Sequence, residues 1–212
     1  MDGNRRFATK KNKAKHEGHS SGLRNLENTV FWCKEIGIKE LTVFALAKEN
    51  LKRPKIEVDT LMNLCKIQFN SLSKPGGSLE RNRIRINILG DISLLPEDVQ
   101  QVMRDSEERT KDYENGTLNV CICYNSKHEI LEAAERLAYK HATDEVKQLS
   151  MEKFEEELYG GKNLSPDIVI RTSNEVRLSN FMLYQSDKSK YFFIKVLWPD
   201  FSLWDFMKII LQ

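Results

Sequence analysis

The segment PDIVIRTSNEVRLSNF, residues 166–181, joins an apolar run to a polar turn that carries two arginines. Residues 166–170 have the length and the β-branching of a buried strand. Arg171 and Arg177 stand in the turn that follows, among hydroxyl side chains. A guanidinium binds phosphate oxygens in pairs and keeps its charge, so the pattern indicates an anion site at the end of a strand. The alternative is a solvated turn whose arginines pair with Glu175.

Other apolar, β-rich runs alternate with helical patterns along the whole chain. The runs cover residues 41–46, 84–89, 118–124 and 191–197. The helical patterns cover about residues 23–36, 56–73, 96–115, 128–141, 151–159 and 203–211. This alternation predicts an α/β fold with a mostly parallel central sheet and helices on both faces. The turn segments have no linker composition, so residues 1–212 are predicted to form a single domain.

The composition of the chain narrows its class. The 212 residues, 40% hydrophobic and 30% charged, are enough for one sizeable core. A net charge of +2 gives no general attraction to nucleic acid, so an anion site must be local. No apolar run approaches the roughly 18–20 residues that span a bilayer, and the polar start has no visible signal peptide. Cys33, Cys65, Cys121 and Cys123 lack paired C-x-x-C spacing, which favours buried reduced thiols over a zinc site.

The first residues, MDGNRRFA, are a second candidate for anion binding. Asp-Gly-Asn is turn chemistry, because glycine adopts positive φ and lets backbone N–H groups approach a ligand. Asp2 is a possible oxygen ligand for Mg²⁺, with Arg5 and Arg6 on the phosphate. The alternative is a disordered basic N-terminus, since residues 1–15 hold six Lys or Arg and one acid.

Several phosphate-handling and hydrolytic signatures are absent from the sequence. It contains no G-x-x-x-x-G-K-[ST] loop, no G-x-G-x-x-G and no G-x-S-x-G. It also lacks D-D-x-x-D, the aspartate cluster of trans-prenyltransferases. Any anion chemistry must therefore use arginines, backbone amides and a single aspartate.

Seven spaced motifs together resemble the cis-prenyltransferases, the family of undecaprenyl and dehydrodolichyl diphosphate synthases. The motifs are MDGNRRFA (1–8), EGHSSG (17–22), FALAKENLKR (44–53), EVDTLMNL (57–64), NILGD (87–91), DIVIRTSNEVRLSNF (167–181) and VLWPDF (196–201). They occur in the family's order and extend over nearly all of the chain. RRF, SNEVRLS and the final FSLWDFMKIILQ are most similar to the eukaryotic catalytic subunits.

The resemblance implies a Mg²⁺-dependent enzyme that condenses isopentenyl diphosphate onto farnesyl diphosphate. It implies a long polyprenyl diphosphate product for dolichol and protein glycosylation, made at the cytosolic face of the endoplasmic reticulum with a membrane-anchored partner of the Nogo-B-receptor type. Asp2 would be the essential metal ligand, and Asn50 would lie near the reacting carbons. The residues implied to bind the substrates are Gly3, Asn4, Arg5, Arg6, Phe7, Lys15, His19, Arg53, Arg171, Arg177 and Ser179.

Several of these residues also have purely structural interpretations. His19 could cap a following helix, Asn50 could end one, and Arg53 could be a surface residue. Glu57 could be a favourable acid near a helix start. The segment 196–201 is expected to serve packing, and the apolar stripe within 58–65 is either ordinary core or, as the family implies, part of a tunnel wall.

The chain departs from the family pattern at four positions. Family members usually carry Arg where Lys15 stands, Ser where Ala47 stands and Gly where Asn174 stands. Many bacterial members have a Mg²⁺-binding Glu where Lys190 stands, and a lysine cannot bind the metal.

Two family segments are expected to be missing from residues 1–212. One is a strand before the Met-Asp-Gly-Asn turn. Without this strand, Asp2 would be held less firmly. The other is an Arg-x-Gly segment after the last helix, which eukaryotic catalytic subunits obtain from a partner. Residues 203–211, with Trp198 and Phe201 before them, are candidates for docking that partner or for the chain's own core. The alternatives to catalysis are a non-catalytic interaction subunit and a binder of nucleic acid or phosphoproteins.

Overall fold

The structure is a computed structural model that describes residues 1–162 and 164–212. Its strands are β1 (Glu40–Ala47), β2 (Ile84–Leu89), β3 (Gly116–Tyr124), β4 (Ile168–Arg171) and β5 (Lys190–Phe193). Its α-helices are α1 (Asn4–Lys10), α2 (Lys15–Glu35), α3 (Lys55–Ser73), α4 (Ser78–Asn82), α5 (Glu97–Thr110), α6 (Ser126–Ala142), α7 (Met151–Glu156) and α8 (Leu203–Ile210). Short 3₁₀ helices are η1 (Lys48–Lys52), η2 (Ile92–Leu94) and η3 (Trp198–Asp200).

All paired strands run parallel, as the alternation of strands and helices predicted. β3 lies between β1 and β2, and β4 pairs with β5. Residues 118–124 of β3 are all buried, which is typical of a strand covered on both faces. The two groups of strands are not hydrogen-bonded to each other, and β1 and β4 face each other across a gap.

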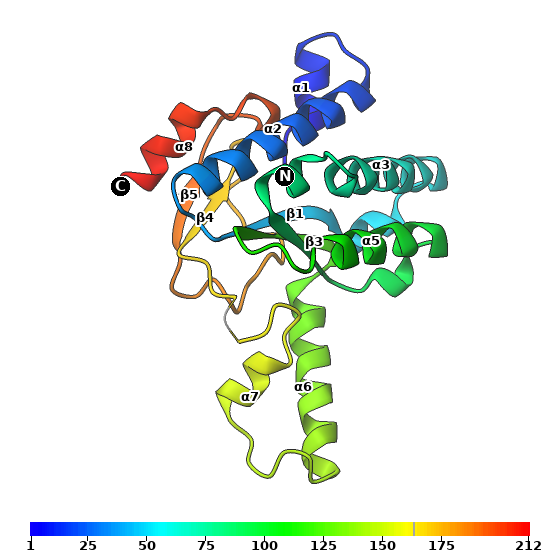
Figure 1. The fold of residues 1–212 in the computed structure, drawn as a ribbon, viewed down its shortest axis with the longest axis vertical. Coiled ribbons are helices and arrows are strands. Elements are labelled where there is room, and N and C mark those ends of the chain that lie inside the picture. The colour runs from blue at the N-terminus through cyan, green and yellow to red at the C-terminus, as the bar shows by residue number, and fades with distance from the viewer. Residues whose placement is uncertain (163) are drawn as a thin grey trace.

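Helices cover the strands on both sides, which confirms the predicted fold class. α2 and α8 lie to one side of the strands, and α3 and α5 lie to the other (Figure 1). α2 packs on α8 through Trp32 and Phe206, whose ring centroids are 6.3 Å apart. α6 and α7 extend away from the sheet at the lower end of the molecule (Figure 1). Within the described residues, no helix is long and apolar enough to cross a membrane.

Most strand and helix bounds agree with the sequence patterns, but α4 was not predicted, α5 ends at Thr110 instead of residue 115, and the largest difference lies near the N-terminus. α1 was not predicted, and α2 begins at Lys15 instead of residue 23. The segment EGHSSG contains poor helix formers, so its local propensity argues against a helix. Gly18 and Gly22 nevertheless lie under α1, because a Cβ atom on either would overlap Asn4. Close packing of α1 on α2 therefore overrides the local preference, and the basic start is helical instead of disordered.

The predicted strand 191–197 ends early, at Phe193. Its continuation still bonds the chain beyond β4: the N–H of Ser173 donates to the Val196 carbonyl over 2.7 Å, and that of Asn174 to the Ile194 carbonyl over 2.8 Å. The backbone in the arginine turn has left strand geometry, with φ of 74° at Ser173 and 59° at Asn174. The segment after β5 thus holds the arginine turn in place.

Candidate functional site

A cavity of about 1190 Å³ occupies the gap between β1 and β4. It touches every residue from Gly37 to Ala47 and every residue from Leu164 to Thr172. Successive side chains of a strand point to opposite faces, so a cavity that meets them all meets the strand's edge. Side chains of α2 and of α3 also line it, which means that the cavity passes through the sheet from one helical layer to the other.

Most of the predicted site residues meet at one end of this cavity, where β1 and β4 finish. Eleven of the thirteen predicted residues line it: Asp2, Gly3, Asn4, Arg5, Arg6, His19, Asn50, Arg53, Arg171, Arg177 and Ser179. Phe7 is half-buried on α1 and does not line it. Lys15 begins α2, but its side chain lies outside the described residues. The carboxyl ends of parallel strands are the usual position for ligands in such sheets.

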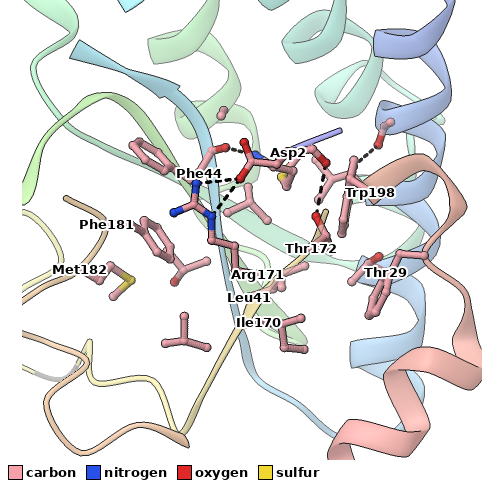
Figure 2. A pocket seen from close by; sticks show the side chains of 18 of the residues that line it. Asp2, Thr29, Leu41, Phe44, Ile170, Arg171, Thr172, Phe181, Met182 and Trp198 are labelled. Atoms are coloured by element: carbon pink, nitrogen blue, oxygen red, sulfur yellow. Dashed lines mark hydrogen bonds and ion pairs between the residues drawn. The ribbon is translucent and has the colours of Figure 1, made fainter. Parts of the chain in front are cut away.

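Asp2 and Arg171 point toward one another at the centre of the site (Figure 2). The Nε and Nη2 atoms of Arg171 each lie 3.0 Å from Asp2 Oδ2. The Arg171 side chain is only 15% exposed and that of Asp2 is 43% exposed, so the carboxylate faces the cavity mouth. The Asp2 carbonyl accepts hydrogen bonds from Ser173 Oγ at 2.8 Å and Trp198 N at 3.2 Å. Later segments of the chain therefore hold the backbone of Asp2, and the expectation that a missing strand would hold it less firmly stays a prediction.

The turn after β4 folds back over Arg171. Arg171 Nη1 donates to Ser179 Oγ at 3.0 Å and to the Arg177 carbonyl. Ser179 has a φ of 52°, in the left-handed region. Arg171 thus brings the Ser179 hydroxyl beside the Asp2 carboxylate, and Arg177 lines the same cavity.

Two glutamates each bridge a pair of arginines around the site. Glu57 on α3 contacts Arg5 and, over 3.6 Å, Arg53. Glu175 contacts Arg6 over 3.3 Å and Arg177 over 2.5 Å. The alternative of a solvated turn whose arginines pair with Glu175 thus holds for Arg177 alone, because Arg171 is mostly buried and pairs with Asp2. Both arginines line the cavity.

The site carries an excess of positive charge. Its five arginines outnumber Asp2, Glu57 and Glu175, which leaves two positive charges for an anion. Burial, followed by the charges of Arg5 and Arg53, lowers the pKa of His19 below its ordinary value of 6.5. His19 is therefore neutral at pH 7 and can donate a hydrogen bond without adding charge.

The neighbours of α1 explain how the N-terminal turn is oriented. Gly3 adopts a φ of 106° and precedes α1, as the predicted turn requires. Asn4 Oδ1 is buried without a hydrogen-bond partner among the described residues. Trp198 donates from Nε1 to the Gly22 carbonyl at 2.8 Å, which ties η3 to α2.

His19 lies inside α2, so the alternative that it caps a following helix is wrong. Trp198 packs as predicted, and it also lines the cavity.

Asp2 is the residue that fits a divalent cation. Among the described residues no group of three or more His, Cys, Asp or Glu side chains could hold a metal by itself. Magnesium needs only one or two carboxylates when phosphate oxygens and water complete its shell. The half-exposed Asp2 carboxylate at the mouth of an arginine-lined cavity meets that requirement.

The residues that depart from the family pattern differ in whether they line the cavity. Ala47 lines the cavity, where it offers no hydroxyl. Asn174 has a φ of 59°, a conformation in which asparagine replaces glycine at low cost. Lys190 is exposed on β5 and does not line the cavity.

Sequence reasoning missed the supporting residues of the site. Ser173 was noticed only as one hydroxyl of the turn, Glu57 only as an acid near a helix start, and Trp198 only as packing or as a candidate for docking a partner. Phe44 and Phe181 were not singled out, yet their rings stack with centroids 5.2 Å apart beside Arg171 (Figure 2). Phe44 lies in the predicted strand 41–46, but nothing local predicts that its ring meets Phe181.

The fold and the site define an α/β protein with an arginine-lined site at one end of a cavity between two parallel strands. The sequence model of the family described as "Putative undecaprenyl diphosphate synthase" matches residues 1–212. The chain therefore belongs to this prenyltransferase family, which confirms the resemblance found in the sequence.

Relatives from distant organisms agree. The chain is 41% identical over 214 residues to a dehydrodolichyl diphosphate synthase complex subunit of Homo sapiens, with all of this chain and 64% of the human protein covered. It is 41% identical over 210 residues to an isoprenyl transferase of Thermotoga maritima, with 99% of this chain and 89% of that protein covered. A crystal structure of lavandulyl diphosphate synthase from Lavandula x intermedia, in complex with dimethylallyl diphosphate, superposes with a TM-score of 0.89 at 29% identity, covering 100% of this chain and 91% of that one. The chain thus spans less than two thirds of the human relative's length.

Proposed function

We propose that the chain is the catalytic subunit of a cis-prenyltransferase that condenses isopentenyl diphosphate onto farnesyl diphosphate. The observation that carries the proposal is the convergence of Asp2 with Arg171, Arg177 and Ser179 at the mouth of one apolar cavity. These residues come from opposite ends of the chain, and each is of a type that binds phosphate or its metal.

The reaction needs no nucleophile from the protein. The bond between the allylic carbon and its diphosphate oxygen breaks, and diphosphate leaves with the electron pair. The double bond of isopentenyl diphosphate supplies the electrons for the new carbon–carbon bond, and a proton then leaves the adjacent carbon. The protein must hold both diphosphates and stabilise the departing one, so positioning and fixed charge supply most of the rate.

Each group of residues has a distinct task in this proposal. The N-terminal turn, with Arg5, Arg6 and the neutral His19, binds the departing allylic diphosphate. Arg171, Arg177 and Ser179 hold the diphosphate of isopentenyl diphosphate. Asn50, on η1, lines the same cavity, and its task is next to the reacting carbons.

Asp2 binds Mg²⁺ together with diphosphate oxygens. When bound there, the metal supplies positive charge for the leaving group. The Arg171 guanidinium keeps the Asp2 carboxylate at a fixed position at the cavity mouth.

The growing prenyl chain occupies the part of the cavity beside α3. Leu61, Leu64 and Cys65 line that part and are half-buried, so they offer an apolar wall next to η1. The sequence pattern within residues 58–65 was compatible with either core or tunnel wall. In this proposal the stripe serves both, since Met62 on the same helix is buried in the core.

The rest of the cavity is a slot that fits one more extended segment, parallel to β1 and β4. The edges of β1 and β4 that face this slot pair with no other described strand. At one end of the slot, the Met1 nitrogen donates a hydrogen bond of 2.5 Å to the Phe44 carbonyl. An N-terminal extension of about six apolar residues, with side chains that alternate between the two faces as in a strand, should raise the melting temperature and slow amide exchange in β1 and β4. An extension of equal length made of Gly and Ser is the control. Equal melting temperatures for the two extensions would contradict this use of the slot.

The product is a long polyprenyl diphosphate for dolichol, and the chain works with a second subunit that ends in Arg-x-Gly. The human relative, described as a complex subunit, supports a partner and a dehydrodolichyl product. Such a partner, of the Nogo-B-receptor type, would bring the chain to the cytosolic face of the endoplasmic reticulum. On α8, Phe206 and Ile209 are buried in the chain's own core, whereas Trp204 and Leu211, the residue directly after the helix, are more than three-quarters exposed.

The test is polyprenyl synthesis from radiolabelled isopentenyl diphosphate, farnesyl diphosphate and Mg²⁺ by the purified chain, with and without the partner subunit. Strong activity of the pair, loss of that activity with a chelator and little activity of the chain alone are the expected results. Robust synthesis by the chain alone would refute the partner requirement. Inactivity in both conditions, with no binding of farnesyl diphosphate in calorimetry, would favour a non-catalytic interaction subunit.

A further inference from the structure

Ser173 occupies a backbone conformation that few residues other than glycine adopt. It lies two residues beyond β4, is 1% exposed and has a φ of 74°. A side chain persists in this left-handed region only where its surroundings compensate the strain, and such positions cluster at functional sites. The tasks assigned above to the arginine turn do not use Ser173.

The polar groups of Ser173 join three separate segments of the chain. Its hydroxyl donates to the Asp2 carbonyl over 2.8 Å. Its carbonyl accepts a hydrogen bond of 3.0 Å from Arg6 Nη1. Its N–H donates to the Val196 carbonyl over 2.7 Å. One buried residue of the arginine turn thus contacts the Asp2 turn and Arg6, both of which belong to the allylic half of the site.

The Ser173 hydroxyl makes the shortest of three hydrogen bonds to the Asp2 carbonyl. Thr172 Oγ1 lies 3.3 Å from the same oxygen, and Trp198 N lies 3.2 Å from it. A Cβ atom on Gly3 would overlap Ser173 Oγ, so the hydroxyl also excludes other residues from position 3. The path of the backbone from Asp2 to Gly3 is therefore set by Ser173 more than by any other side chain that contacts it.

We propose that Ser173 is a positioning residue for prenyl transfer, which rests on the proposed function. Its hydroxyl fixes the Asp2 turn and its carbonyl restrains Arg6, so the two diphosphate-binding halves of the site keep one geometry. Asp2 meets Arg171 through its side chain and Ser173 through its backbone, so both ends of the residue are held. Loss of the hydroxyl removes the shortest of the three hydrogen bonds at the backbone end and leaves every charged group in place.

The test compares Ser173→Gly and Ser173→Ala with the unmodified chain, each in complex with the partner subunit. Glycine tolerates positive φ and removes only the hydroxymethyl group, so Ser173→Gly should fold. Ser173→Ala keeps Cβ and removes the hydroxyl alone. Both should lower kcat by about tenfold with little change in either KM, since a misplaced metal–diphosphate affects the transition state. Amide exchange at Trp198 and Phe7, whose N–H groups bond the Asp2 and Gly3 carbonyls, should quicken by about tenfold.

Ser106→Ala is the matched control. Ser106 is a fully buried serine that does not line the cavity, and its hydroxyl donates a hydrogen bond of 2.7 Å to the Val102 carbonyl. It should leave kcat and the exchange at Trp198 unchanged. An unchanged kcat in both Ser173 variants overturns the positioning role, and so does an effect of Ser173→Gly alone, which would point to backbone freedom. Unchanged exchange at Trp198 overturns it as well.

Failure of the proposed function looks different from failure of this role. An unmodified complex that makes no polyprenyl product overturns the reaction, and with it the role of Ser173 in prenyl transfer. The exchange measurements then decide by themselves whether the hydroxyl holds the Asp2 turn, because they need neither substrate nor turnover.

Discussion

Replacing Arg171 by lysine keeps the charge of the site and removes the fork of the guanidinium. Arg171 reaches Asp2 through Nε and Nη2, both at 3.0 Å, and Ser179 through Nη1 at 3.0 Å. A lysine carries a single nitrogen and cannot meet both partners in this geometry. At least one charge-assisted hydrogen bond is therefore lost, at a cost of about 1.5–3 kcal/mol.

That cost corresponds to a fall of roughly ten- to a hundredfold in kcat/KM for isopentenyl diphosphate. The assay is incorporation of radiolabelled isopentenyl diphosphate by the chain with its partner subunit, at varied isopentenyl diphosphate and saturating farnesyl diphosphate. Calorimetric titration with isopentenyl diphosphate measures binding without turnover. Arg171→Ala should fall at least as far, because it also removes the charge.

Arg136→Lys is the control for the loss of a fork at an ion pair outside the site. Arg136 contacts Glu132 over 3.7 Å and Glu157 over 3.6 Å, and it does not line the cavity. Its kcat/KM should stay within about twofold of the unmodified value, as for most substitutions on a surface. If Arg171→Lys keeps both the affinity for isopentenyl diphosphate and kcat/KM, then the fork geometry plays no part in binding and the reasoning fails.

Three further substitutions test other parts of the site. Asp2→Ala should abolish prenyl transfer and leave the fold intact, because losing the metal contact costs several kcal/mol of barrier; near-normal turnover at any Mg²⁺ concentration would rule out this role. Gly22→Ala should destabilise the chain by about 1–3 kcal/mol in urea unfolding, since the new methyl group would overlap Asn4 Oδ1; an unchanged midpoint would contradict the packing of α1 on α2. His19→Gln should flatten the dependence of stability on pH below about 6.5. The folded pKa of His19 lies below its ordinary value, so unfolding takes up a proton there and stability falls as the pH drops; identical slopes in both proteins would disprove it.

The strands and most helices could be predicted because their patterns are local. β2 has the predicted bounds, and α3 differs from its prediction by one residue. The start of α2 could not be predicted, since its glycines argue against a helix until α1 is placed over them. Propensity sums over a few neighbouring residues, whereas the packing that decides this segment comes from another helix.

The sequence by itself determined the parallel α/β fold, from local alternation of strand and helix patterns, and the family, from motifs spaced along the chain. It also predicted which residues bind the anion, because arginines and a single aspartate stand out by residue type. Only the tertiary structure decided which residues meet. Asp2 contacts Arg171 across 169 positions of the chain, and Glu57 joins arginines from two other elements. Ser173 became visible as a link between the two ends of the chain only when β4 and the N-terminal turn were side by side. Such contacts depend on how the chain returns on itself, and no local pattern of side chains encodes that path.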